Sequence, residues 1–66
     1  SISPENNVYV YNLAILLDKV GDWSQAAALY QQLVEAGERG ESIPARQADI
    51  QERLTFIRSN SVNKVM

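Results

Sequence analysis

The amino-acid sequence predicts a small all-α fold, an antiparallel helical hairpin followed by a third helix. Apolar residues recur at three- and four-residue intervals in three stretches of the chain, which is the spacing of side chains along one face of a helix. The first stretch contains an unbroken apolar run from Leu13 to Leu17, which is too long for the alternation of a half-exposed strand. Gly21 then stands where a left-handed residue commonly ends a helix.

Size and composition narrow the class of protein. The chain has 66 residues and a mass of 7.4 kDa, which suits one small domain. Its 45% hydrophobic residues exceed what a disordered chain carries, while 21% charged residues and a mean hydropathy of -0.24 argue against a membrane span. Cys and His are absent, so disulfides, thiolate nucleophiles, the usual zinc sites and His-based triads are excluded. A net charge of -2 argues against nucleic-acid binding.

The first predicted helix covers residues 7–20. Its residues are mostly apolar or good helix formers, and further apolar side chains fall on two other sides, so we expect it to be buried on more than one side. The main apolar stripe consists of Val10, Leu13, Ala14 and Leu17.

The second predicted helix covers residues 23–37 and starts after a short turn. Asp22 and Gln25 have the spacing of a reciprocal capping box, and Gly37 or Gly40 can end the helix. Because the turn is so short, the first two helices must pack antiparallel. The inward-facing residues are Trp23, with the aromatic ring expected in the core, and Ala26, Ala27, Tyr30, Leu33 and Val34.

A third helix follows a polar linker and occupies most of residues 41–58. Ser42 is a plausible N-cap with Pro44 in the first turn, so the helix is expected from about Ile43 to Arg58. One face is apolar, through Ile43, Ile50, Leu54 and Ile57, and another carries Arg46, Asp49 and Arg53 at intervals suited to pairing along the helix. Residues 59–66 show no clear pattern and are expected to fray.

The hairpin resembles a tetratricopeptide repeat, a helix–turn–helix unit of about 34 residues. Leu13 and Ala26 match the repeat pattern outright, and Gly21-Asp22-Trp23 stands at its turn. Residues of related character occupy further pattern positions, namely Val10, Ala14, Leu17 and Tyr30. The resemblance implies an α-solenoid fragment in which residues 7–40 form one repeat.

Pro4 falls in phase with the proline that closes the preceding repeat. The resemblance therefore assigns residues 1–6 to the end of that repeat and residues 41–58 to a capping helix, so that the chain is the C-terminal end of a longer array. Glu38 departs from the pattern, because a proline is due there, and Leu33 replaces a usual small residue. An unrelated three-helix bundle is the alternative, and it is all-α as well.

The resemblance implies a protein-interaction module that binds a partner protein or peptide along a concave surface. The residues it places there are Val8, Tyr11, Ile15, Asp18 and Lys19. Some family members clamp a peptide carboxylate with basic residues on this stripe, but Tyr11 and Ile15 stand at those places, so a groove for a hydrophobic segment is expected instead. The alternative is that Tyr11 and Ile15 only cover the third helix.

A second face of the first helix carries Tyr9, Leu16 and Val20. The resemblance directs it toward a preceding repeat, and without that neighbour two copies of the chain are expected to cover each other. A purely structural role, as a cap or dimerisation end of the array, is therefore the alternative function. The acids Glu35, Glu38 and Glu41 form either a solvated loop or a site for a basic partner.

No enzyme activity, metal or cofactor is expected. Asp18 and Asp22 are the candidate carboxylate pair, but no histidine is present to act as a base and a single hairpin encloses no pocket that could shift a pKa.

Overall fold

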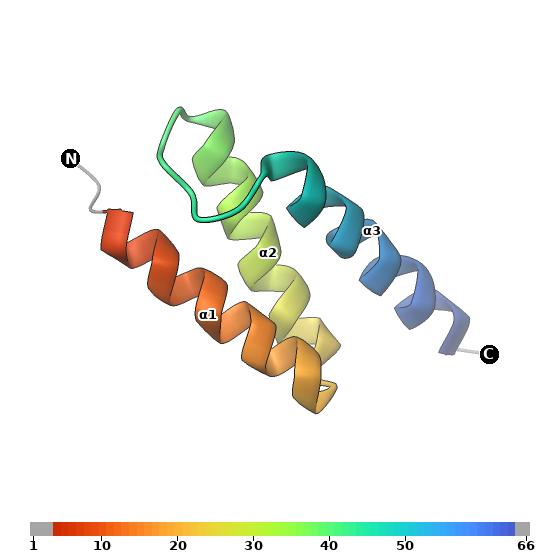
Figure 1. Ribbon diagram of the computed structural model, residues 1–66. Helices are drawn as coiled ribbons and strands as arrows, with labels where there is room; N and C mark the ends of the chain where they lie inside the picture. The colour runs from red at the N-terminus through yellow and green to blue at the C-terminus, as the bar shows by residue number, and fades with distance from the viewer. Residues whose placement is uncertain (1–3, 65–66) are drawn as a thin grey trace.

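The computed structural model describes the backbone of residues 4–64 and the side chains of residues 5–60. It contains the helices α1 (Pro4–Val20), α2 (Trp23–Glu38) and α3 (Gln47–Lys64), and residues 4–64 include no strand. In Figure 1, α1 and α3 run in roughly the same direction and α2 runs back between them. The predicted all-α hairpin with a third helix is confirmed.

The turn between α1 and α2 is built from local contacts. Gly21 has a φ of 87°, and its N–H donates to the Asp18 carbonyl at 3.2 Å. The Asp22 side chain accepts from the Gln25 N–H at 3.4 Å and from the Gln25 side-chain amide at 2.8 Å. Asp22 therefore caps α2 as predicted. The box is not the usual reciprocal one, because the Gln25 side chain donates to the Asp22 carboxylate.

The start of α3 differs from the prediction. The helix begins at Gln47, so Ser42 and Pro44 lie in the preceding loop and Ser42 is not its N-cap. Proline disfavours helical backbone in the residue before it, which keeps Ile43 out of a helix. The Ser42 carbonyl also accepts a hydrogen bond from the Asn7 side chain at 2.9 Å, which fixes the loop against α1.

The outer ends of α1 and α3 are longer than predicted. Pro4 is the first residue of α1, where its missing N–H costs nothing, so residues 4–6 are helical and α1 begins before the predicted residue 7. Residues 59–64 include neither glycine nor proline, and α3 continues through Lys64 instead of ending at Arg58. Residues 1–3, 65 and 66 lie outside the described part of the chain.

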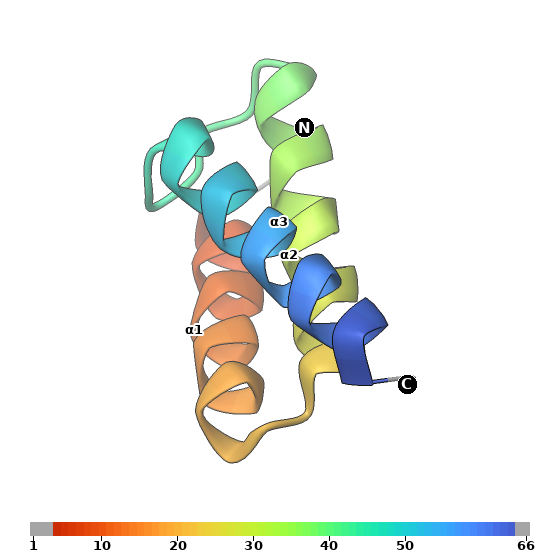
Figure 2. The same cartoon turned by 90° about the vertical axis from the view of Figure 1, so that its right-hand side faces the viewer.

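The core is centred on α2, which packs against both other helices, whereas the backbones of α1 and α3 do not approach each other. Figure 2 shows α3 lying diagonally across the hairpin. Leu33 and Ile57 are the largest fully buried side chains. The buried apolar cluster consists of Ala14, Ala26, Tyr30, Leu33, Val34, Ile50, Leu54 and Ile57. Ile43 and Trp23 pack against this cluster and are only partly buried.

Candidate functional site

An open groove of about 420 Å³ lies between α1 and α3. Its existence follows from the packing, because α2 holds α1 and α3 without bringing their backbones together. The groove is lined by Tyr11, Ile15, Asp18 and Lys19 of α1, by Tyr30 of α2, by Ala45 of the loop, and by Asp49, Ile50 and Arg53 of α3.

Most of the predicted binding stripe lies in this groove. Tyr11, Ile15, Asp18 and Lys19 line it, whereas Val8 does not and is 43% exposed on another part of α1. Tyr11 and Ile15 are half-buried, and Tyr11 also packs against the core cluster. The sequence left open whether these two side chains bind a partner or only cover the third helix, and their positions are compatible with both. They lie beside α3 and still present surface to the groove.

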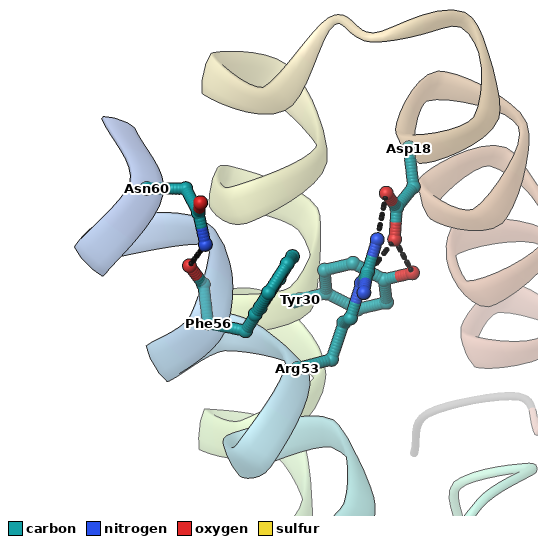
Figure 3. Close-up of polar contacts among 5 residues, drawn as sticks. All are labelled: Asp18, Tyr30, Arg53, Phe56 and Asn60. Atoms are coloured by element: carbon teal, nitrogen blue, oxygen red, sulfur yellow. Dashed lines mark hydrogen bonds and ion pairs between the residues drawn. The ribbon is translucent and has the colours of Figure 1, made fainter. Parts of the chain in front are cut away.

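Asp18 joins all three helices through a polar cluster, which we call the Asp18 clamp (Figure 3). Arg53 of α3 donates from Nε and Nη2 to the two carboxylate oxygens of Asp18, each at 2.7 Å. The Tyr30 hydroxyl of α2 donates to Asp18 Oδ2 at 3.1 Å. Arg53 therefore pairs across the fold and not, as its spacing indicated, with Asp49 on its own helix.

The charges of the clamp are mutually stabilised. The hydrogen bond from Arg53 lowers the pKa of Asp18 below its ordinary value of 3.8, and the Tyr30 hydroxyl lowers it further against the opposing effect of burial. Burial, together with the Asp18 carboxylate, raises the pKa of Tyr30 to about 12. At neutral pH Asp18 is thus ionised and Tyr30 is a neutral donor. The Asp18 carboxylate is already compensated and is not an open site for a cation.

The remaining charges of the groove lie on opposite sides of it. Lys19 of α1 and Asp49 of α3 are both exposed, and neither forms an ion pair within the described residues. Asp22, the other member of the candidate carboxylate pair, is occupied as the cap of α2. The structure therefore gives Asp18 and Asp22 separate structural roles, and the groove chemistry consists of apolar walls with one positive and one negative rim.

A second, more polar cleft of about 330 Å³ lies between the start of α1 and the end of α2. Asn7 is only 5% exposed there, and its side-chain amide donates to Glu41 Oε1 at 3.2 Å and to the Ser42 carbonyl. Glu41 also pairs with Arg39 at 3.0 Å. The hydrogen bonds from Asn7 and Arg39 lower the pKa of Glu41. The role of Asn7 was missed, although its place on the stripe of Val10, Ala14 and Leu17 signals a buried polar group.

The acidic cluster is not a set of three free carboxylates. Glu41 is engaged by Asn7 and Arg39, and Glu35 accepts from the Gln31 side chain at 3.2 Å. The expected solvated loop is wrong for two of the three acids, because Glu35 and Glu38 belong to α2 and only Glu41 lies in the loop. The internal contacts of Glu35 and Glu41 also argue against a site for a basic partner.

The face assigned to stacking or self-association is exposed. Tyr9 is 66%, Leu16 56% and Val20 68% exposed. On α3, Phe56 is 45% exposed, and sequence reasoning did not identify it. Its ring makes an edge contact with Trp23, with the centroids 6.0 Å apart, and the Arg53 guanidinium lies 4.7 Å above it.

The described residues contain no group of His, Cys, Asp and Glu that could hold a metal ion. Within residues 4–64, no helix has both the length and the apolar character needed to cross a membrane. Comparisons of the chain with models of known protein families, with curated proteins and with solved structures find no match.

Proposed function

We propose that the chain is a protein-interaction module of the tetratricopeptide-repeat type, which binds a hydrophobic segment of a partner protein in the groove between α1 and α3. One observation carries the proposal. Tyr11 and Ile15 lie half-buried on the wall of an open groove, and they belong to the stripe where the resemblance places the partner. The α1 residues of the groove extend from Tyr11 to Lys19, about two helical turns, which is long enough to contact a short peptide segment lying beside the helix.

The lining indicates what kind of segment fits. Tyr11, Ile15, Ala45 and Ile50 offer apolar surface, and burying such surface is worth about 25 cal/mol per Å². The Asp18 clamp adds no net charge, because its carboxylate and guanidinium compensate each other. A segment with one or two apolar anchors therefore binds better than a strongly charged one, and its affinity changes little with salt.

A structural role for this end of the molecule is the second candidate. It is supported by the exposed apolar face of α1, which lies apart from the groove and suits packing against another helix. The two roles use different surfaces of α1, so experiments can separate them.

The test uses a random-peptide display library panned on the immobilised chain, followed by titration of enriched peptides. Tyr11→Ala is the test variant and Tyr9→Ala the matched control, since both remove a tyrosine from α1 but only Tyr11 lines the groove. Loss of a hot-spot anchor costs more than about 1 kcal/mol, so Tyr11→Ala should weaken binding by at least about fivefold. Tyr9→Ala should leave it unchanged.

Salt titration and a charge variant complete the test. Affinity should stay nearly constant between low and physiological salt, and the combined variant Glu35→Gln, Glu38→Gln and Glu41→Gln should bind like the parent. Enriched peptides that are basic, lose affinity in salt and ignore Tyr11→Ala would move the binding surface to the acids and overturn the proposal.

A further inference from the structure

The exposed apolar surface of the molecule is concentrated on α1. Of the five large apolar side chains exposed among the described residues, Val8, Tyr9, Leu16 and Val20 all lie on this helix. On its inner side α1 buries only Asn7 and Ala14 completely. Much of the apolar content of α1 is therefore left uncovered by the fold described above.

Three of these side chains form one stripe. Tyr9, Leu16 and Val20 are separated by seven and four positions, which places them on one side of the helix, whereas Val8 lies on the side of Ile15, seven positions from it. Asn7 and Ala14 mark the opposite side, which packs on α2, and Tyr11 and Ile15 mark the side at the groove. We call the stripe of Tyr9, Leu16 and Val20 the outer face of α1.

Three polar residues follow the edge of the outer face that borders the groove, and they have a symmetric arrangement. Glu5 lies near the start of α1, Asn12 near its middle, and Lys19 near its end, and all three are exposed. The two charges are opposite in sign and about equally far from Asn12 along the chain. A second copy of α1 running antiparallel would therefore set each Lys19 near the Glu5 of the other copy. Antiparallel alignment also suits the helix dipoles.

We propose that two copies of the chain associate through the outer faces of α1, antiparallel and with Asn12 near the two-fold axis. Tyr9 of each copy then lies over Leu16 of the other, because these residues are almost equally distant from Asn12. The two Asn12 amides can hydrogen-bond to each other at the axis. A two-fold contact requires a surface that complements itself, and this face meets that requirement in both charge and apolar content.

A membrane surface fits the face less well. Helices that lie on membranes carry several basic residues beside their apolar face, whereas this face has one Lys and one Glu and the whole chain has a net charge of -2. The proposal does not depend on the groove function, because Tyr9, Leu16 and Val20 do not line the groove and only Lys19, at its rim, belongs to both surfaces.

Sedimentation equilibrium from low micromolar to millimolar concentration tests the association. The apparent mass should rise from 7.4 kDa toward twice that value. Leu16→Lys should keep it at the monomer value, whereas Phe56→Lys, the same change at an exposed apolar residue of α3, should not prevent association. Circular dichroism verifies that both variants keep their helices. A parent chain that stays monomeric throughout would overturn the proposal.

Disulfide trapping tests the relative orientation of the two α1 helices. The chain has no native cysteine, so only an introduced cysteine can form the link. Under mild oxidation, Asn12→Cys should form a linked dimer readily because the two side chains meet at the axis. Lys19→Cys should not link to itself, since antiparallel pairing separates its two copies by most of the helix length. Efficient linking of Lys19→Cys would indicate a parallel pair and overturn the antiparallel arrangement. Ser24→Cys, exposed on α2, is the control for random collision.

Discussion

The two connections between helices differ in whether a distant residue adds to their local contacts. The turn from α1 to α2 uses contacts among neighbours: Gly21 N–H donates to Asp18, Asp22 N–H donates to Leu17 at 2.9 Å, and Asp22 caps α2. The loop from α2 to α3 also contains a left-handed glycine, Gly40 with a φ of 88°. Local backbone bonds end α2 there as well, such as that from the Glu41 N–H to the Ala36 carbonyl at 3.0 Å. This loop, however, is also bound by Asn7, which is more than thirty residues away in sequence.

This difference shows how α3 is placed. The first connection fixes its helices by itself, whereas the second is held in position by α1, a helix whose backbone α3 does not approach. The Asn7 contacts hold the loop near the start of α3, and the Asp18 clamp holds α3 near its middle. The position of α3, and with it the groove, therefore depends on tertiary contacts that the hairpin does not need.

The largest expected effect comes from removing the apolar support of α3. Leu54 is 4% exposed, and Leu54→Ala should destabilise the fold by about 2–5 kcal/mol, comparable with the whole stability of about 3–5 kcal/mol expected for a domain of this size. Thermal melting followed by circular dichroism should show most of the chain unfolded. The control is Leu16→Ala at 56% exposure, which should melt within a few degrees of the parent. Equal melting of both variants would mean that α3 is not docked.

Asn7→Ala should have the next largest effect, because it breaks the long-range support of the second connection. The change leaves the Ser42 carbonyl and Glu41 without their amide partner and should cost about 1–3 kcal/mol. Urea denaturation measures this loss. The neighbouring Asn6 is exposed, so Asn6→Ala should stay within about 0.5 kcal/mol of the parent. A neutral Asn7→Ala would contradict the dependence of the loop on α1.

Gly21→Ala and Gly40→Ala test whether the two connections depend equally on a left-handed glycine. No heavy atom lies within 4 Å of a Cβ built at Gly21 or Gly40, so only the backbone strain at positive φ is introduced. Each substitution should cost about 1–2 kcal/mol, and the two costs should be similar. The measurement is the free energy of unfolding in urea. A much larger cost at one site would mean that the connections differ in their backbones as well as in their side-chain contacts.

The pH dependence of stability tests the Asp18 clamp and should be the smallest effect. Because the pKa of Asp18 is lowered on folding, its contribution is complete above the unfolded value near 3.8 and is lost as the pH falls through the folded value. The Arg53 side chain is 42% exposed, which limits the loss to about 1 kcal/mol. The pKa of Tyr30 rises from 10.0 to about 12, so stability should also fall as the pH rises between these values.

Two variants assign these changes. Asp18→Asn should reduce the acid-induced loss, and Tyr30→Phe should remove the alkaline loss while costing about 1 kcal/mol at neutral pH through the missing hydrogen bond. Urea midpoints measured across the pH range report both. An alkaline loss that persists in Tyr30→Phe would show that another group is responsible.

Features that depend on neighbouring residues could be predicted from the sequence, whereas features that depend on distant contacts could not. Gly21, Asp22 and Gln25 act within one turn of chain, so their types and spacing were sufficient to place the first connection. Ser42 and Pro44 gave a local start signal for α3, yet the helix begins at Gln47 and the Ser42 carbonyl is bound by Asn7 of α1. Local capping preferences could not reveal a partner on a different helix.

The groove was predicted only on one of its sides. The resemblance grouped five residues of α1, and helical spacing supported four of them, since they share one helix face. All but one line the groove: Tyr11, Ile15, Asp18 and Lys19 do, and Val8 does not. The facing residues of α3 and the pairing of Asp18 with Arg53 could not be inferred, because 35 positions separate that pair and only the packing of α3 on α2 brings them together.

The edge contact between Trp23 and Phe56 gives the protein a built-in optical probe. Trp23 is the single tryptophan of the chain and lies at the start of α2, while its aromatic neighbour belongs to α3. Departure of α3 would expose the indole to water and move its fluorescence emission to longer wavelength, even if the hairpin stayed helical. Far-ultraviolet circular dichroism reports the total helix content of α1, α2 and α3. Recording both signals during one denaturation would therefore reveal whether α3 leaves before the hairpin melts or whether the molecule unfolds in a single step.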